Sequence, residues 1–263
     1  MKKLHFGYMM SNSFDNNVTN HRFSLKCCPC DNARQKVQNI SVKINNEPKI
    51  FYDHDTFGNK VINGIISEPH NLFEVIVSGD VITGLDICEE YENDICKTYT
   101  FKYFTPFTKP GKLLTDAYKN SNIESFDAPY DKATYILHIA HKLISYQKGV
   151  TDITTTAEQA MEKKSGVCQD YAHIMLALCR MAKLPSRYVV GMIVGEGESH
   201  AWVEVLCRGI WYGFDPTNNK LTDDDYIKIS CGRDYNDCTV NKGVFIGFTN
   251  QHQSVRVCVT ENK

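Results

Sequence analysis

The sequence predicts an α+β protein in which an N-terminal antiparallel β-sandwich precedes a domain of helices and an antiparallel sheet. Strand-like alternation of apolar residues dominates residues 1–85, whereas helical periodicity becomes clear only from residue 131. Strands and helices that are segregated along the chain in this way are typical of α+β proteins. The 263 residues can form two modest domains. We divide them into residues 1–85, a connector over 86–128, and residues 129–263.

The N-terminal strands are predicted from apolar residues that alternate between turn signals. Residues 40–44 and 73–77 both place an apolar side chain at every second position. Asn45-Asn46 and Ser78-Gly79-Asp80 are typical turn sequences. Short strands separated by such turns predict a small sandwich. We find no acid–base constellation in this region.

Three helices are predicted in the second domain. Residues 131–148 place their apolar side chains on one helical face. Thr156-Ala157-Glu158-Gln159 has the spacing of a capping box, so a short helix begins there and runs to about Lys164. A third helix begins at Cys168, because apolar residues then recur at helical spacing until Pro185.

His200 and Asp215 lie in two strands that are predicted to form a hairpin. If Cys207-Arg208 is the two-residue turn, His200 lies directly opposite Asp215, and opposed side chains are about 5 Å apart. Gly209 could shift this turn, and a slip of one residue would move one partner to the other face. Along the first strand, Trp202 shares the face of His200.

Cys168 lies where a thiol nucleophile would be activated. A helix N-terminus carries unsatisfied N–H groups and a partial positive charge, which favour a thiolate, and the Cys168 N–H could donate to an oxyanion. Taken singly, a helical cysteine is usually a small buried hydrophobe, a histidine that begins a strand is usually structural, and an aspartate before proline is usually a turn residue. Together, Cys168, His200 and Asp215 are the parts of a Cys-His-Asp acyl-transfer site.

Several segments of the chain carry motifs that point to one family. The matching stretches are Gly166-Val167-Cys168-Gln169-Asp170-Tyr171-Ala172-His173, Leu184-Pro185-Ser186-Arg187-Tyr188-Val189, His200-Ala201-Trp202-Val203-Glu204-Val205, Phe214-Asp215-Pro216-Thr217-Asn218, and also residues 55–59, 232–235 and 255–259. They resemble the transglutaminase-like superfamily, and specifically its bacterial two-domain branch. The likeness spans nearly the whole chain and is strongest over residues 146–217. Its motifs are specific for the superfamily but not for a reaction, because members include cross-linking acyltransferases, peptidases, amidases and inactive proteins.

The resemblance implies a fold and a set of roles. The second domain would have the papain-like transglutaminase core, in which the nucleophile helix packs on an antiparallel sheet. Cys168 would be the nucleophile, His200 the base and Asp215 the acid that orients the base.

Three further residues are candidates for supporting this site. Tyr146 could provide the second oxyanion donor, although packing is the more usual role of such a tyrosine. Gln169 and Trp202, which lie beside the nucleophile and the base in sequence, could complete the oxyanion site or support the catalytic side chains.

Composition and charge argue against several partners. The net charge is −2 and the basic residues are scattered, so we expect no binding to nucleic acid. No run approaches the roughly 20 apolar residues that a membrane span needs, so we expect no membrane association. The basic N-terminus lacks the apolar segment of a signal peptide, which predicts a cytoplasmic location.

The 11 cysteines predict free thiols, because an odd number cannot all pair within one chain and a reducing cytosol keeps thiols free. Cys27-Cys28-Pro29-Cys30 is the densest cluster. A zinc site typically draws its tetrahedral ligands from two spaced pairs, and the second pair is missing. We therefore expect no metal and no cofactor, and we assign the cluster no function.

The sequence thus favours a thiol acyl-transfer enzyme that acts on a peptide or protein amide through a thioester. Hydrolysis by a cysteine peptidase or amidase is preferred, because no site for a second substrate is evident. A protein-glutamine transglutaminase and a catalytically silent binding module of the same fold are the alternatives. A redox-sensing role for the many thiols is a weaker possibility. The oligomeric state stays open.

Overall fold

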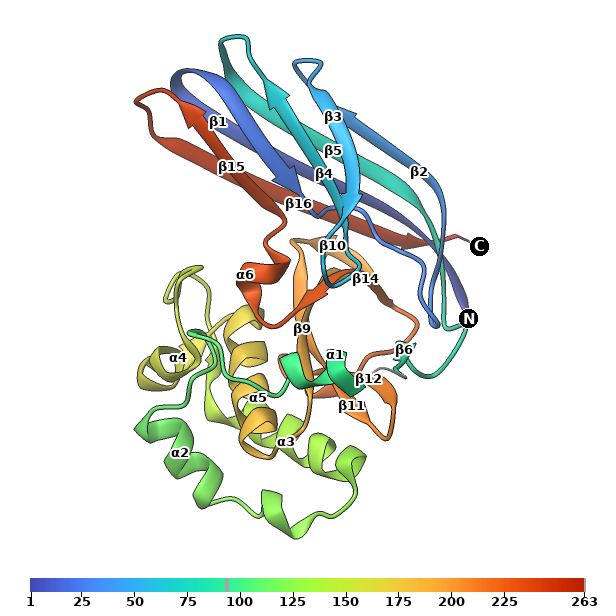
Figure 1. Ribbon diagram of the computed structural model, residues 1–263, viewed down its shortest axis with the longest axis vertical. Coiled ribbons are helices and arrows are strands. Elements are labelled where there is room, and N and C mark those ends of the chain that lie inside the picture. Colours follow the sequence, from blue (N-terminus) through green and yellow to red (C-terminus); the bar gives the residue numbers. More distant parts are fainter. Residues whose placement is uncertain (93–94, 263) are drawn as a thin grey trace.

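The computed structural model describes residues 1–92 and 95–262. Residues 93 and 94, in the predicted connector, and residue 263 lie outside the described residues. Strands from both ends of the sequence form one part of the molecule, and the middle of the sequence forms the other part, which contains most of the helices (Figure 1). Within the described residues, no helix has the length and apolar character needed to cross a membrane.

One long strand organises the first part. The first half of β1 (Lys2–Leu25) pairs with β5 (His70–Thr83) and β16 (Gln251–Glu261). Its second half pairs with β4 (Lys60–Ile66) and β15 (Asn241–Ile246). The outer strands of the two layers are β2 (Lys36–Ile44), which pairs with β5, and β3 (Lys49–His54), which pairs with β4.

The two halves of β1 face each other across an apolar core. Phe23 in the second half packs against Phe73 of β5, with the ring centroids 4.7 Å apart. Every second residue in the first half of β1 points inward and is buried: Leu4, Phe6, Tyr8, Met10, Asn12 and Phe14. The predicted α+β class, with antiparallel sheets that curl into an N-terminal β-structure, is confirmed.

The C-terminal strands return to the N-terminal part. Residues 241–246 and 251–261 pair with β1, so the sheet of the first part contains strands from far beyond residue 85. β10 (Gly195–Gly197) joins the same sheet beside β16. The predicted domain boundaries at residues 85 and 128 stay a prediction. The strand pairings of residues 241–261 with β1 cross these boundaries.

The second part is a sheet with helices on one face. Its strands follow the order β13 (Lys220–Leu221), β12 (Ile210–Asp215), β11 (His200–Cys207), β9 (Ser186–Ile193), β14 (Tyr226–Gly232), and β6 (Glu90–Tyr91) pairs with β12. The helix α5 (Cys168–Met181) packs on β11 and β9 and is almost completely buried. The other helical elements are α1 (Ile95–Thr100), α2 (Lys112–Lys119), η1 (Ile123–Ser125), α3 (Pro129–Leu143), α4 (Ala157–Lys163) and α6 (Tyr235–Cys238).

Two helix ends test the sequence patterns. The capping box at Thr156 and Gln159 is confirmed, and α4 ends at Lys163 as expected. The predicted end of the preceding helix at residue 148 is wrong, because α3 ends at Leu143. Ser145 and Tyr146 instead form a short strand, β7, that pairs in parallel with β8 (Ser165–Gly166) just before α5.

Side-chain amides join the two parts along β14, the edge strand of the second sheet. Asn59 donates to the Cys231 carbonyl and accepts from the Cys231 N–H, both at 2.7 Å. Gln35 makes the same pair of bonds with the Lys228 backbone, both at 2.8 Å. Each amide imitates the backbone of a neighbouring strand, so the open edge of β14 is satisfied. Asn59 closes the 55–59 motif, whose Asp55 carboxylate accepts its backbone N–H.

A buried ion cluster lies on the face of the second sheet away from α5. Glu204 of β11 is fully buried and accepts hydrogen bonds from Arg187 of β9, at 2.5 Å, and Lys228 of β14, at 2.8 Å. The positive charges of both partners hold the pKa of Glu204 below its usual range, against the effect of burial, which alone would raise it. Three neighbouring strands are thus held by one carboxylate.

Candidate active site

The start of α5 fixes the position of Cys168. The Asp170 carboxylate accepts hydrogen bonds from the Val167 N–H and the Thr151 hydroxyl, both at 2.7 Å. A side chain at Gly166 would clash with it, because a Cβ there would lie 2.4 Å from the Asp170 carboxylate. These contacts hold the chain as it enters the helix, and Cys168 is the first helical residue.

The hairpin that carries His200 and Asp215 has a turn one residue later than predicted. Cys207 pairs with Ile210, so Arg208-Gly209 forms the two-residue turn, with φ of 54° and 82°. Positive φ at both central residues is typical of the tight turns that suit strand twist. The predicted register with His200 directly opposite Asp215 is therefore wrong; extended by one step, the observed register sets Trp202 opposite Asp215.

The side chains of His200 and Asp215 nevertheless meet. The register differs from the predicted one by two residues, and because side chains alternate with a period of two, both stay on one face. His200 Nε2 lies 2.8 Å from Asp215 Oδ2. The contact is diagonal across the hairpin.

Asp215 is held by four further hydrogen bonds. Its Oδ1 accepts from the backbone N–H groups of Thr217, at 2.9 Å, and Asn218, at 3.1 Å. Its Oδ2 accepts from the Asn218 amide and the Tyr226 hydroxyl, both at 2.7 Å. Asp215 is fully buried, which alone would raise its pKa, but the bonds to His200, Tyr226 and Asn218 lower it. The carboxylate is therefore kept ionised in a buried place.

The sequence reasoning did not find the supporting roles of Tyr226 and Asn218. Asn218 could have been found, since an Asp-Pro-Thr-Asn sequence favours local side-chain bonds to the backbone. Tyr226 begins β14, a strand that does not pair with β12, and nothing in its neighbourhood along the chain marks it.

His200 is positioned to hold a proton. Burial alone would lower its pKa, but the hydrogen bond to Asp215, the interaction with Cys168 and the negative charge that each can carry raise its pKa to about 10. The ring stacks on Trp202 at a centroid distance of 6.4 Å, and Tyr226 packs against Trp202 edge-on. His200 therefore lies between Cys168 and Asp215 with its ring plane restrained.

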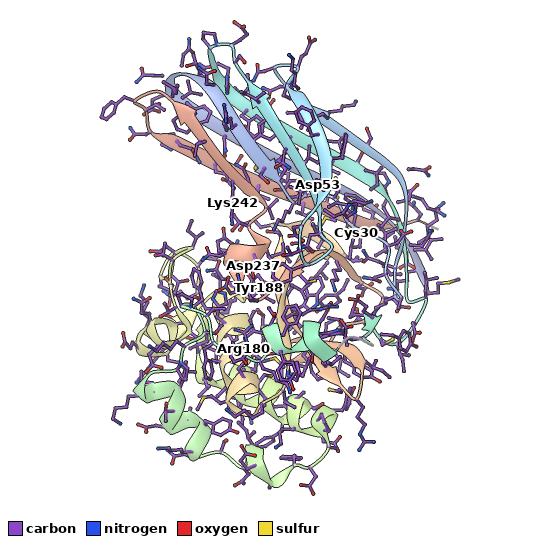
Figure 2. The ribbon with its side chains drawn as sticks, viewed as in Figure 1. Cys30, Asp53, Arg180, Tyr188, Asp237 and Lys242 are labelled. Carbon is purple, nitrogen blue, oxygen red and sulfur yellow. The ribbon has the colours of Figure 1, made fainter. Side chains whose placement is uncertain are left out.

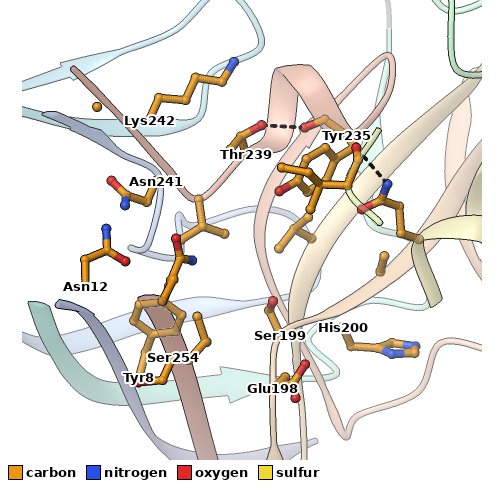
Figure 3. Close-up of a pocket in the computed structure, with 18 of the residues that line it drawn as sticks. Tyr8, Asn12, Glu198, Ser199, His200, Tyr235, Thr239, Asn241, Lys242 and Ser254 are labelled. Carbon is orange, nitrogen blue, oxygen red and sulfur yellow. Dashed lines mark hydrogen bonds between the residues drawn. The ribbon is translucent and has the colours of Figure 1, made fainter. Parts of the chain in front are cut away.

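A cleft of about 960 Å³ gives access to Cys168 and His200. Residues of the second part and of the N-terminal β-structure line it together, among them Tyr188 of β9 and Lys242 of β15 (Figure 2). Glu198 and Ser199 lie next to His200, while Asn12 and Asn241 lie on the wall that belongs to the N-terminal part (Figure 3). The cleft is thus shared between the two parts of the molecule.

The other predicted site residues, Gln169, Trp202 and Tyr146, lie at different positions relative to the cleft. Gln169 lines the cleft and donates to the Ile153 carbonyl at 3.3 Å. Trp202 is buried beneath the His200 ring. Tyr146 is half exposed; partial burial and the charge that Cys168 can carry raise its pKa. It is not among the residues that line the cleft.

The cysteine cluster lies elsewhere. Cys27 and Cys28 are buried in the N-terminal part, and Cys30 donates to the Gly58 carbonyl at 3.8 Å. Among the described residues, no group of three or more histidine, cysteine, aspartate or glutamate side chains is arranged to hold a metal ion. His138 and His141 of α3 contact the loop after Asp215, through Asn219 and the Pro216 carbonyl.

Two regions of the chain match known protein families. Residues 116–216, which contain Cys168, His200 and Asp215, match the transglutaminase-like superfamily. Residues 7–82 match the bacterial transglutaminase-like N-terminal region. The chain carries a transglutaminase-like core region and a bacterial transglutaminase-like N-terminal region, as its motifs indicated.

Individual relatives and one solved structure are also similar to the chain. An uncharacterised Mycobacterium leprae protein is 36% identical over 118 residues, which cover 41% of this chain and 42% of that protein. An uncharacterised Mycobacterium bovis protein is 30% identical over 161 residues, 54% of this chain and 51% of that one. The chain therefore spans about half the length of these curated relatives. A crystal structure of a candidate cysteine protease from Cytophaga hutchinsonii superposes with a TM-score of 0.82 at 20% identity, covering 100% of this chain and 91% of that one, and so shares the fold.

Proposed function

We propose that the protein is a thiol acyl-transfer enzyme that hydrolyses amide bonds, with Cys168 as nucleophile, His200 as acid and base, and Asp215 as the residue that orients His200. The observation that carries the proposal is the position of His200, which shares a cleft with Cys168 and bonds to the buried Asp215. A thiol, a base and an orienting carboxylate are the parts that nucleophilic catalysis needs.

The reaction follows from these positions. The Cys168 thiolate attacks the amide carbonyl, and the Cys168 N–H stabilises the oxyanion. His200 gives its proton to the leaving nitrogen as the C–N bond breaks and the thioester remains. Water then loses a proton to His200 and forms a C–O bond with the acyl carbon. The C–S bond breaks, and the acid is released.

Acylation by a small ester tests the proposal. Wild-type protein is mixed with p-nitrophenyl acetate, quenched in acid and mapped by mass spectrometry, and fluorescent casein provides an amide substrate. We expect an acetyl group on Cys168 and casein turnover, both lost in Cys168→Ala. Cys258→Ala removes another half-buried cysteine and is the matched control; it keeps both.

Other outcomes distinguish the alternatives. Turnover that persists in Cys168→Ala would contradict the proposed nucleophile. Incorporation of a fluorescent primary amine into casein, in preference to hydrolysis, would identify a transglutaminase. A Cys168 that forms no adduct and is alkylated no faster than Cys258 would identify a silent binding module. The cytoplasmic location stays a prediction, which cell fractionation tests.

A further inference from the structure

We propose that the open end of the N-terminal β-structure is a substrate subsite, which binds an extended peptide segment through Asn12, Asn241 and Tyr8. This inference rests on the proposed function and adds the class of substrate: an uncharged, extended stretch of peptide on one side of the bond to be broken.

Asn12 is a polar residue in a position that the strand pattern assigns to the core. It belongs to the inward-facing series of β1, in which Met10 and Phe14 are its neighbours. It is only 2% exposed, and its Oδ1 has no hydrogen-bond partner among the described residues. Tyr8 is 1% exposed, and its hydroxyl is equally unpartnered within the described part of the chain. Buried polar atoms without partners cost free energy, so such groups call for an explanation.

These polar groups face the same cleft as the catalytic residues. Tyr8, Asn12 and Asn241 line it together with Cys168 and His200. Asn12 and Asn241 lie on one wall, and His200 lies on the other (Figure 3). The Asn241 Oδ1 is a third buried atom without a partner in the described residues. The unpartnered groups are therefore directed into the space that leads to the nucleophile.

Open strand edges border this space. β10 covers β16 only at residues 257–259, and β15 pairs with β1 alone among the described strands. Gln251, Gln253 and Val255 of β16 line the cleft on the part of the strand that β10 does not cover. Extended peptides bind to open strand edges through backbone hydrogen bonds. β10 ends at Gly197, three residues before His200. A peptide that pairs with β16 beyond the end of β10 would therefore lie beside the wall of the cleft that carries His200.

The chemistry of the lining fits peptide groups. Apart from Lys242 and His21, the polar side chains on this wall are uncharged amides and hydroxyls, which can donate and accept hydrogen bonds. The free Oδ1 atoms of Asn12 and Asn241 are acceptors that match the N–H groups of a peptide. The subsite therefore selects by hydrogen bonding, without a demand for a charged side chain.

The test compares a substrate that fills the subsite with one that does not. Fluorogenic octapeptides extend along the cleft, whereas p-nitrophenyl acetate reaches only Cys168. In Asn12→Leu, we expect the ratio of kcat/KM for octapeptide to that for ester to fall about fivefold or more, mainly through KM. The unfolding midpoint should not fall, because leucine removes a buried atom without a partner. If Asn12 had only a structural role, Asn12→Leu would lower the unfolding midpoint and leave the kcat/KM ratio unchanged.

Two further variants complete the design. Asn71→Leu makes the same substitution at an exposed position of β5 outside the cleft, and it should leave the ratio unchanged. Asn241→Ala, nearer the rim, provides a second measurement if Asn12→Leu does not fold. An unchanged ratio in both cleft variants, with turnover intact, would overturn the subsite but not the enzyme.

Binding separates the two proposals when turnover is absent. Fluorescein-labelled octapeptides are titrated into Cys168→Ala protein, with and without Asn12→Leu, and followed by anisotropy. Weaker binding in the double variant supports the subsite even if the proposed reaction fails. Equal binding in both proteins, or tighter binding of a chito-oligosaccharide than of any peptide, would overturn it.

Discussion

At the scale of single residues, the contact between His200 and Asp215 could be predicted even though the predicted strand register was wrong by two residues. The sequence placed both on one face of a hairpin, and they are on one face, although the turn lies one residue later and the contact is diagonal. Alternation with a period of two preserves the face when the register shifts by two. The bond from Tyr226 to Asp215 could not be predicted in this way, because β14 is placed by its pairing with β9 rather than by a local pattern.

Asp215→Asn tests how far the carboxylate sets the charge of His200. We expect kcat/KM to fall by about a hundredfold or more, because the ring loses its orientation and its charged partner. The pKa of His200, about 10 in this site, should fall, so the alkaline limb of the activity profile should move to lower pH. The pH dependence of kcat/KM for the small ester measures both effects. Asp127→Asn, at an exposed position, is the control.

The same substitution changes how stability depends on pH. The folded-state pKa of His200 lies above the ordinary value of about 6.5, so its ionic bonds stabilise the fold fully below pH 6.5. This contribution is lost as the pH rises towards 10. Urea unfolding between pH 6.5 and 10 should therefore show a smaller loss in Asp215→Asn than in wild type. Equal slopes would contradict the charged pair.

At the scale of elements, the strands of the second sheet are joined by charge as well as by backbone pairing. Helix α3 ends early because Ser145-Tyr146 pairs with Ser165-Gly166, and helical periodicity alone cannot reveal such a competing contact. The ion cluster around Glu204 is a similar case. Its three members belong to three strands, so the sequence of β11 shows a glutamate on the same face as His200 without showing what binds it.

Glu204→Gln should destabilise the second sheet strongly. The change leaves Arg187 and Lys228 buried beside a neutral amide, and removal of one partner from a buried ion pair typically costs about 3–5 kcal/mol. Urea unfolding at neutral pH measures the loss. Glu162→Gln changes an exposed glutamate of α4 and should have little effect. A loss below about 1 kcal/mol would show that the cluster contributes no more than a surface ion pair.

At the scale of the whole molecule, the two parts are joined by amides that imitate strand backbone. The sequence predicted a motif at residues 55–59 but not its role, because Asn59 binds Cys231, which is far away in sequence. The pairing of residues 241–261 with β1 could not be predicted from the sequence either. Alternation predicts that a segment is a strand, but it does not name the partner.

Asn59→Ala should loosen the joint between the two parts. It removes both bonds to the edge of β14, which leaves a buried N–H and a buried carbonyl without their partner and costs about 2 kcal/mol. We expect a lower unfolding midpoint, and faster proteolysis near residues 55–59. Asn71→Ala, the same change at an exposed site, should alter neither. An unchanged midpoint would show that the joint depends on other contacts.

The pairing of β1 with β15 and β16 also sets an order for assembly during synthesis. Nearly the whole of the described chain separates these partners, and contacts between residues so distant in sequence form slowly. Cys168, His200 and Asp215 leave the ribosome before β15 and β16 do, so the catalytic side chains can come together while one wall of the cleft is still missing. A nascent chain at this stage would contain the Cys168 thiol but not the complete surface that we propose binds a peptide. Under the proposed function, cleavage of peptides would begin only once the strands from 241 to 261 have joined the first strand.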